Sequence, residues 1–331
     1  MALTGFDPKF TDFPDYIIGI TKEIWEDRGI ATLHQYYAPD IVVRSPASVV
    51  VGNQGVIAAT MATLAEFPDR QLLGEDVIWS GTPEAGMLSS HRIISTATHA
   101  RDGVYGAASG KKLRYRILAD CHARDNAIDD EWLIRDQTAI VRQIGWDPID
   151  YARDLIAREG GPDACVRPLT PANDRPGPYT GRGNENACGQ RHADLLTRIM
   201  GASMAAIETD YDRAATLHYP GGDTGHGWAA ADGFWMGLRA AFPDAEFRID
   251  HQIGRDDPNM PPRSAIRWSL HGTHSGWGAF GRPTGAKVYL LGISHAEWGE
   301  LIGGQVKLRR EWTLFDETAV WKQILLQTGD L

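Results

Sequence analysis

The chain has 331 residues, of which 43% are hydrophobic and 23% charged, which is typical of a globular protein with room for two domains. Its formal net charge of −10 argues against a nucleic-acid partner, because nucleic-acid-binding domains usually carry a basic face. The N-terminus lacks an apolar signal segment and no run of about 18 apolar residues occurs, so we expect a cytoplasmic protein without a membrane partner.

The first part of the chain predicts helices followed by strands. Ile17, Ile20 and Ile24 keep helical spacing, and residues 54–67 predict a second helix that is closed by an FPD turn. Four strand-like segments joined by short turns come next. A short helix is expected to begin after the DQTA sequence at residues 136–139.

The middle of the chain changes in composition before the same order returns. Residues 147–159 predict one amphipathic helix with Pro148 near its start. Residues 160–189 are dense in Pro, Gly, Asn and Asp and predict a linker or an ordered belt. After this segment, the helical spacing of Leu195, Ile199 and Ile207 predicts one helix, and residues 228–242 predict another. Four strands and a short helix complete the chain.

The two parts are copies of one domain. Arg92 and Arg267 are 175 positions apart, as are the His residues of two TH pairs, His99 and His274. The sequence EWLIRDQTAIVRQI at residues 131–144 returns as EWTLFDETAVWKQI 180 positions later, which predicts a longer last hairpin in the second copy. ATLHQY at residues 31–36 also echoes ATLHYP at residues 215–220.

This order predicts an α+β fold with two tandem cone-shaped barrels. Each barrel is expected to be a curved antiparallel sheet with helices on one face. The predicted domains are residues 1–145 and 190–331, with a linker at residues 146–189 that contains one helix.

The stretch GWGAFG at residues 276–281 has the glycine spacing of a dinucleotide-binding turn. Such a site needs a helix after the glycines, whereas Pro283 and Gly285 prevent one and residues 287–295 return to a strand pattern. The glycines therefore predict a hairpin turn, and no cofactor is expected.

The longer sequence GTHSGWGAFGRPTGAKV at residues 272–288 resembles the SnoaL-type polyketide cyclase family of the nuclear transport factor 2-like superfamily. The first copy keeps the length of this hairpin but lacks its proline. The resemblance implies a cone-shaped barrel, dimerisation through the sheet, and cofactor-free acid/base chemistry on polyketide-like substrates by an Asp with help from a His. It also implies that the two copies pack as an internal pseudo-dimer; a homodimer of the whole chain is left open.

Candidate catalytic residues lie on the last strands of each copy. Asp120 and His122 share one strand face, and His295 and Glu297 do so at the aligned positions. A carboxylate beside an imidazole suits proton abstraction near neutral pH, although a polar strand end explains the same pattern. Asp136 would end an inward-looking apolar face in the first copy.

Asp316 holds the same position as Asp136 in the second copy, on a face shared with Trp312. Burial would raise the pKa of either carboxyl group, as acid/base catalysis requires. Both residues also directly precede a predicted helix, so a helix N-cap is the alternative.

Substrate-binding candidates come mainly from the second copy, whose tryptophans favour it as the active pocket. His218, like His34, either projects into the mouth of the cone or caps a helix C-terminus. An inward Arg267 or Arg92 would bind an anionic or carbonyl group, and a rim salt bridge is the alternative. The predicted substrate-binding residues are His218, Arg267, His271, Trp268, Trp312 and Glu297.

No metal site is expected. His271 and His274 would point to opposite faces of a strand, and Cys121, Cys165 and Cys188 lack zinc-site spacing. The sequence thus predicts a cofactor-free acid/base enzyme of polyketide cyclase type that performs aldol cyclisation or isomerisation on a small apolar carbonyl compound. The alternative is a noncatalytic small-molecule binding module with the same fold.

Overall fold

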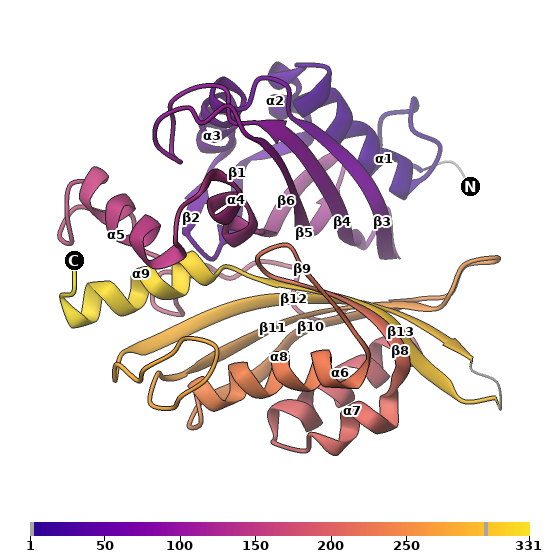
Figure 1. Cartoon of the computed structure of the whole chain (residues 1–331). Coiled ribbons are helices and arrows are strands. Elements are labelled where there is room, and N and C mark those ends of the chain that lie inside the picture. Colours follow the sequence, from indigo (N-terminus) through magenta and orange to yellow (C-terminus); the bar gives the residue numbers. More distant parts are fainter. Residues whose placement is uncertain (1–2, 301–303) are drawn as a thin grey trace.

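The computed structural model describes residues 3–300 and 304–331 and contains two curved sheets, one in each half of the chain. Each sheet carries helices on one face, and the opposite faces of the two sheets pack against each other (Figure 1). The predicted α+β fold with two tandem barrels is confirmed. The turn of the predicted longer last hairpin includes residues 301–303, which lie outside the described residues.

The first half begins with helices and ends with a four-stranded meander and a short helix. A π-helical turn follows α1, and a short 3₁₀ turn precedes α2. Its elements are α1 (Phe13–Thr21), α2 (Leu33–Tyr36), β1 (Tyr37–Ser45), β2 (Ser48–Val51), α3 (Asn53–Glu66), β3 (Gln71–Thr82), β4 (Gly86–Thr98), β5 (Lys112–Arg124), β6 (Ala127–Arg135) and α4 (Gln137–Ile144).

The linker contributes α5 (Pro148–Arg158) and the short strand β7 (Gly181–Arg182). The second half then repeats the order of the first. Its elements are α6 (Ala187–Met200), α7 (Ala205–Asp210), β8 (Tyr211–Tyr219), β9 (Asp223–His226), α8 (Gly227–Ala241), β10 (Glu246–Arg255), β11 (Arg263–Thr273), β12 (Lys287–Glu300), β13 (Val306–Phe315) and α9 (Glu317–Thr328). The domain boundaries at 145/146 and 189/190 stay predictions, although α4 ends and α6 begins close to them.

Both sheets are mixed rather than purely antiparallel. The strand order is β2-β1-β6-β5-β4-β3 in the first sheet and β7-β10-β11-β12-β13-β8-β9 in the second. The last strand of each meander lies beside the first strand of its half and runs parallel to it, as in the pairs β1–β6 and β8–β13. The short strand β7 also runs parallel to β10, so the expectation of antiparallel sheets is wrong at one strand pair in the first sheet and at two in the second.

Two predicted details differ from the structure. The helix predicted from Leu195 through Ile207 is divided into α6 and α7, because Ala202 adopts a left-handed conformation with φ of 69°. The match between the two ATLH sequences is also wrong: His34 lies in α2, whereas His218 lies on strand β8. Since His218 pairs with Trp312 as Arg44 pairs with Trp132, the structural counterpart of His218 is Arg44.

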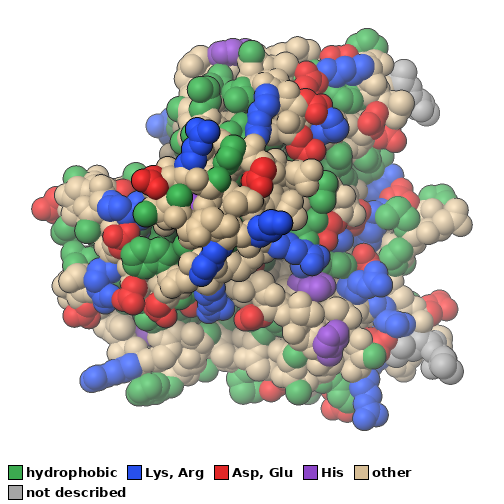
Figure 2. Space-filling model, turned by 45° about the horizontal axis from the view of Figure 1, so that its top comes forward, with side chains coloured by type: hydrophobic (Ala, Val, Ile, Leu, Met, Phe, Trp, Pro, Cys, Tyr) green, Lys and Arg blue, Asp and Glu red, His purple; other side chains and the backbone are tan. Residues whose placement is uncertain are grey.

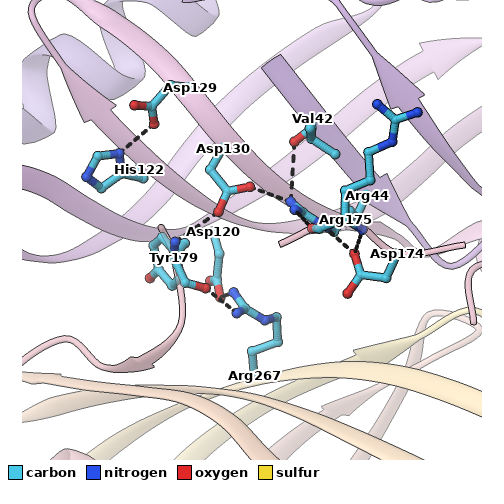
Figure 3. Close-up of polar contacts among 10 residues, drawn as sticks. All are labelled: Val42, Arg44, Asp120, His122, Asp129, Asp130, Asp174, Arg175, Tyr179 and Arg267. Atoms are coloured by element: carbon cyan, nitrogen blue, oxygen red, sulfur yellow. Dashed lines mark hydrogen bonds and ion pairs between the residues drawn. The ribbon is translucent and has the colours of Figure 1, made fainter. Parts of the chain in front are cut away.

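The linker is an ordered belt between the two sheets. Its Asp174 accepts a hydrogen bond of 2.6 Å from Nε of Arg44, and the backbone N–H of Tyr179 donates one of 2.9 Å to Asp130 (Figure 3). Arg44 also forms a buried ion pair with Asp130. Apolar residues from both sheets and the belt join in one cluster: Leu118, Trp132, Ile134, Leu169, Tyr179, Leu291, Ile293 and Leu314.

Candidate functional site

A cavity of about 400 Å³ lies in the first half, between its helices and the helix-covered face of its sheet. This volume is within the range of small-molecule sites, which are mainly apolar with a few polar groups. The apolar wall comes from α1, α3 and the strands β4 to β6. It includes Ile17, Ile20, Val56, Ile93, Ile117 and Leu133.

Among the titratable groups that face this cavity are a carboxyl group and an imidazole on different strands. Glu131 on β6 and His91 on β4 are both buried, and burial raises the pKa of Glu131 to about 7 and lowers that of His91 to about 4. Interaction with Tyr37 lowers the Glu131 pKa in part, and Asp130 raises it. Near neutral pH the site therefore combines a carboxyl group close to half ionised with a neutral imidazole.

The relative position of these two groups follows from the strand register. Glu131 is opposite Cys121 on β5, which is opposite Ser89 on β4, two residues before His91. The backbones at Glu131 and His91 are therefore two strands apart and offset by two residues, a separation of roughly 12 Å, with space for a ligand between the side chains. The hydroxyl of Ser89 lies 3.4 Å from Nδ1 of His91 and orients the ring.

In the second half, tryptophan side chains occupy the corresponding space. Trp235, Trp268 and Trp298 are fully buried, and Trp268 packs so closely on Gly292 that a Cβ there would lie 2.1 Å from the ring. The residues 175 positions earlier are smaller: Thr60, Ile93 and Ala123. The predicted binding residue Trp268 is therefore a core residue, and the choice of the second half as the active one stays a prediction.

Several predicted residues lie at the interface between the sheets instead of the cavity wall. Arg267 donates a hydrogen bond of 3.0 Å to Asp120 (Figure 3). Its guanidinium group also stacks on Trp132, 4.1 Å from the ring centroid. At the aligned positions, Arg92 lies 3.5 Å from His295 and stacks on Trp312 at 3.5 Å. This reciprocal pattern is that of a two-fold symmetric dimer interface within one chain.

Burial at this interface changes the ionisation of both partners. It raises the pKa of Asp120, which Arg267 lowers in part, and it lowers the pKa of His295 well below its ordinary value, with Arg92 adding to that effect. His295 also contacts the hydroxyl of Ser90 at 2.8 Å. The catalytic roles of Asp120 and His295 stay predictions, since their contacts are those of an interface.

Asp136 and Asp316 cap helices, as the alternative interpretation predicts. Asp136 accepts a hydrogen bond of 3.0 Å from the Ala139 N–H at the start of α4, and others from Gly221 and Gly222 of the second half. Asp316 accepts bonds from the N–H groups of Thr318 and Ala319. Burial raises the pKa of each carboxyl group to about 6, and Asp316 borders the cavity from the second half. The strand faces that carry Asp136 and Asp316 point towards the other sheet, so the prediction that these faces point into their own barrel is wrong.

The remaining predicted residues are dispersed. His122 pairs with Asp129 at 2.5 Å, and Glu297 pairs with Arg310 at 3.0 Å. His271 is exposed near the end of β11, where its ring meets the edge of Tyr289. None of these three predicted residues lines the first-half cavity, so their functional roles stay predictions.

His218 and Trp312 lie together at a second cavity of about 320 Å³ between the halves. Their rings stack with centroids 5.6 Å apart. Burial lowers the pKa of His218 to about 4, and the nearby Arg116 lowers it further. Asp136 also lines this cavity, so the structure brings three predicted residues together there.

The sequence interpretation missed the polar residues of the main cavity. Glu131 is the first residue of the EWLIRD motif, directly before Trp132, and the alternation of strand residues places it on the opposite face. His91, Arg70 and Arg135 were not singled out either. A comparison of the copies would have found these three, because Ile266, Ala245 and Phe315 occupy the equivalent positions.

The face of the molecule shown in Figure 2 has no comparable concentration of one kind of side chain among the described residues. On the face shown in Figure 2, acidic, basic and hydrophobic side chains are interspersed. Within residues 3–300 and 304–331, no group of three or more His, Cys, Asp or Glu side chains is arranged to hold a metal ion. No helix of that described part is long and apolar enough to cross a membrane.

Comparisons with known proteins agree with the duplicated fold. Residues 16–144 match the family described as SnoaL-like polyketide cyclase, and residues 193–305 match the family described as SnoaL-like domain. A search of curated proteins found no match.

Similar solved structures each cover one half of the chain. IdmH from Streptomyces antibioticus is 23% identical with a TM-score of 0.35, over 40% of this chain and 97% of that one. TsrD from Streptomyces laurentii is 16% identical with a TM-score of 0.34, over 39% and 95% of the two chains. A SnoaL-like polyketide cyclase from Agrobacterium tumefaciens is 18% identical with a TM-score of 0.32, over 42% and 98%.

Proposed function

Both halves of this chain are SnoaL-like domains, and on that premise we propose that the first half is a cofactor-free acid/base catalyst acting on a small, mainly apolar carbonyl compound. The observation that carries the proposal is the buried Glu131, whose pKa of about 7 is suited to proton transfer near neutral pH. Its cavity is the part of the described structure with both the volume and the apolar wall for such a substrate.

In the proposed mechanism, Glu131 removes a proton from the carbon next to the carbonyl group. The neutral ring of His91 donates a hydrogen bond from Nε2 to the developing enolate oxygen, while the Ser89 hydroxyl donates to Nδ1. The thiol of Cys121 stays protonated because burial raises its pKa well above the ordinary value. The enolate then attacks a second carbonyl in an aldol cyclisation, and the resulting alkoxide takes the proton held by Glu131. In an isomerisation, the enolate takes that proton back at another carbon.

Deuterium exchange tests the first step without knowledge of the natural substrate. The α-protons of 2-tetralone, an apolar bicyclic ketone, exchange in D₂O at a rate measurable by NMR. We expect the protein to accelerate this exchange near pD 8 and Glu131→Gln to slow it at least about 100-fold, as for loss of a general base. Glu311→Gln is the matched control, because Glu311 holds the equivalent position in the filled second half and should leave the rate unchanged.

The rival function is a noncatalytic binding module. It predicts that 2-tetralone binds in the cavity but exchanges its protons no faster than in buffer. Equal exchange rates for the parent protein and Glu131→Gln would likewise count against the proposed catalyst.

A further inference from the structure

Two arginines in the wall of the first-half cavity lack an acidic partner. Arg70, just before β3, is only 5% exposed, and its Nε makes a single long contact of 3.4 Å with the Ser95 hydroxyl. Arg135, at the end of β6, is half-buried, and its buried Nε has no hydrogen-bond partner. Within the described residues, neither guanidinium forms an ion pair. A buried cation without a counter-charge is unfavourable and calls for an explanation.

The arginines that are as deeply buried as Arg70 are all paired with carboxylates. These pairs are Arg44 with Asp130, Arg92 with Glu75, Arg263 with Asp76 and Arg267 with Asp120. The protein thus neutralises buried guanidinium groups wherever they serve packing between its elements. Arg70 and Arg135 depart from this rule, and both do so in the wall of the cavity.

The second half shows that the fold does not require these polar side chains. The positions equivalent to Arg70 and Arg135 hold Ala245 and Phe315, both buried in the apolar core. Tyr105 and Tyr115, whose side chains adjoin the two arginines, correspond to Phe280 and Leu290. The polar cluster therefore accompanies the open cavity.

The cluster carries an excess of positive charge. Burial lowers the pKa of Arg70, Tyr115 opposes that effect, and the like charge of Arg135 adds to it, so the two guanidinium groups sense each other. Burial raises the pKa of Tyr115, but the arginines outweigh it and bring that pKa below its ordinary value. An ionised Tyr115 would balance one positive charge and leave the other.

We propose that Arg70 and Arg135 form the anion-binding end of this cavity and that its substrate is an elongated, mainly apolar carbonyl compound ending in a carboxylate. Guanidinium groups bind a planar carboxylate through paired N–H donors. Glu131 and Arg135 share one face of β6 four residues apart, roughly 13 Å along the strand. The carboxylate would thus hold the far end of the substrate while its reacting carbonyl lies near Glu131. The inference rests on the proposed function for the role of Glu131.

Calorimetric titration with 2-naphthoate and the uncharged 2-naphthamide tests the anion site, since the two probes differ in charge but hardly in shape. The parent protein should bind the carboxylate at least tenfold more tightly than the amide. Arg70→Met and Arg135→Phe should each weaken 2-naphthoate binding at least tenfold and change 2-naphthamide binding less than threefold. Arg114→Gln removes an exposed arginine of β5 and should behave as the parent does.

The proposal is overturned if 2-naphthoate does not bind the parent, binds it no more tightly than 2-naphthamide, or keeps its advantage in both cavity variants. The parent comparison decides the matter even if a variant fails to fold, which circular dichroism would detect. Carboxylate binding that depends on both arginines, together with no acceleration of 2-tetralone exchange, would refute the catalyst and keep the anion site. Acceleration of 2-tetralone exchange without a preference for 2-naphthoate over 2-naphthamide would keep the proposed catalyst and refute the anion site.

Discussion

Exchange of Glu131 for glutamine should remove a large part of the pH dependence of stability. Burial raises the pKa of Glu131 from 4.5 to about 7, so the folded state holds this proton more tightly than the unfolded state does. The stabilisation is complete below pH 4.5 and is lost as pH rises through 7. A shift of this size corresponds to roughly 3 kcal/mol, of which about 2.5 kcal/mol falls between pH 5 and pH 8.

Urea unfolding of the parent and of Glu131→Gln at these two pH values measures the effect. The parent should lose about 2.5 kcal/mol more of its free energy of unfolding than the variant between pH 5 and pH 8. Glu84→Gln, in the exposed β3–β4 turn, controls for the loss of one surface carboxylate. If the parent and Glu131→Gln show the same pH dependence, Glu131 is not a buried proton-holding group and the argument for its catalytic role fails.

Two further predictions concern the interface and the cavity. Asp120→Ala leaves Arg267 buried without its carboxylate and should lower the free energy of unfolding by about 3–5 kcal/mol. The control is Asp154→Ala, which breaks an exposed helical ion pair and should change the free energy of unfolding by less than about 1 kcal/mol. Chemical denaturation of both variants and the parent measures the difference. Thr60→Trp places in the cavity wall the residue found at the equivalent position of the second half, and calorimetry should show 2-naphthamide binding at least tenfold weaker than in the parent. The control is Met61→Trp, on the exposed side of α3, which should bind 2-naphthamide as the parent does. Undiminished binding by Thr60→Trp would place the ligand elsewhere.

The duplicated fold was predictable because the residues that recur 175 positions apart record the same packing twice. Hairpin glycines, the FPD turns after the second helices and the EW strands all return at nearly constant spacing. The ATLH match misled because four letters recur by chance in a helix and in a strand. Local sequence identity carries less weight than register, which pairs Arg44 with Trp132 and His218 with Trp312.

The candidate site was less predictable because both faces of each sheet are buried. Alternation along a strand shows which residues share a face, but burial on both sides removes the polarity that would show which face meets the cavity. On β6, Trp132 and Ile134 face the other sheet, while Glu131 and Arg135 face the cavity. Choosing the face that meets the other sheet therefore left Glu131 and Arg135 out of the candidates.

The two halves divide the requirements of a binding protein between them. The second half fills its interior with three tryptophans and gains the apolar burial that stabilises a fold. The first half leaves a cavity and two unpaired guanidinium groups, both of which lower stability. Trp132 and Ile134 pack against the filled half, so the strand that carries Glu131 and Arg135 is held in place from its other face. The open half can therefore keep polar groups in the wall of an apolar cavity, whose positions would be less rigid in a single domain of this size.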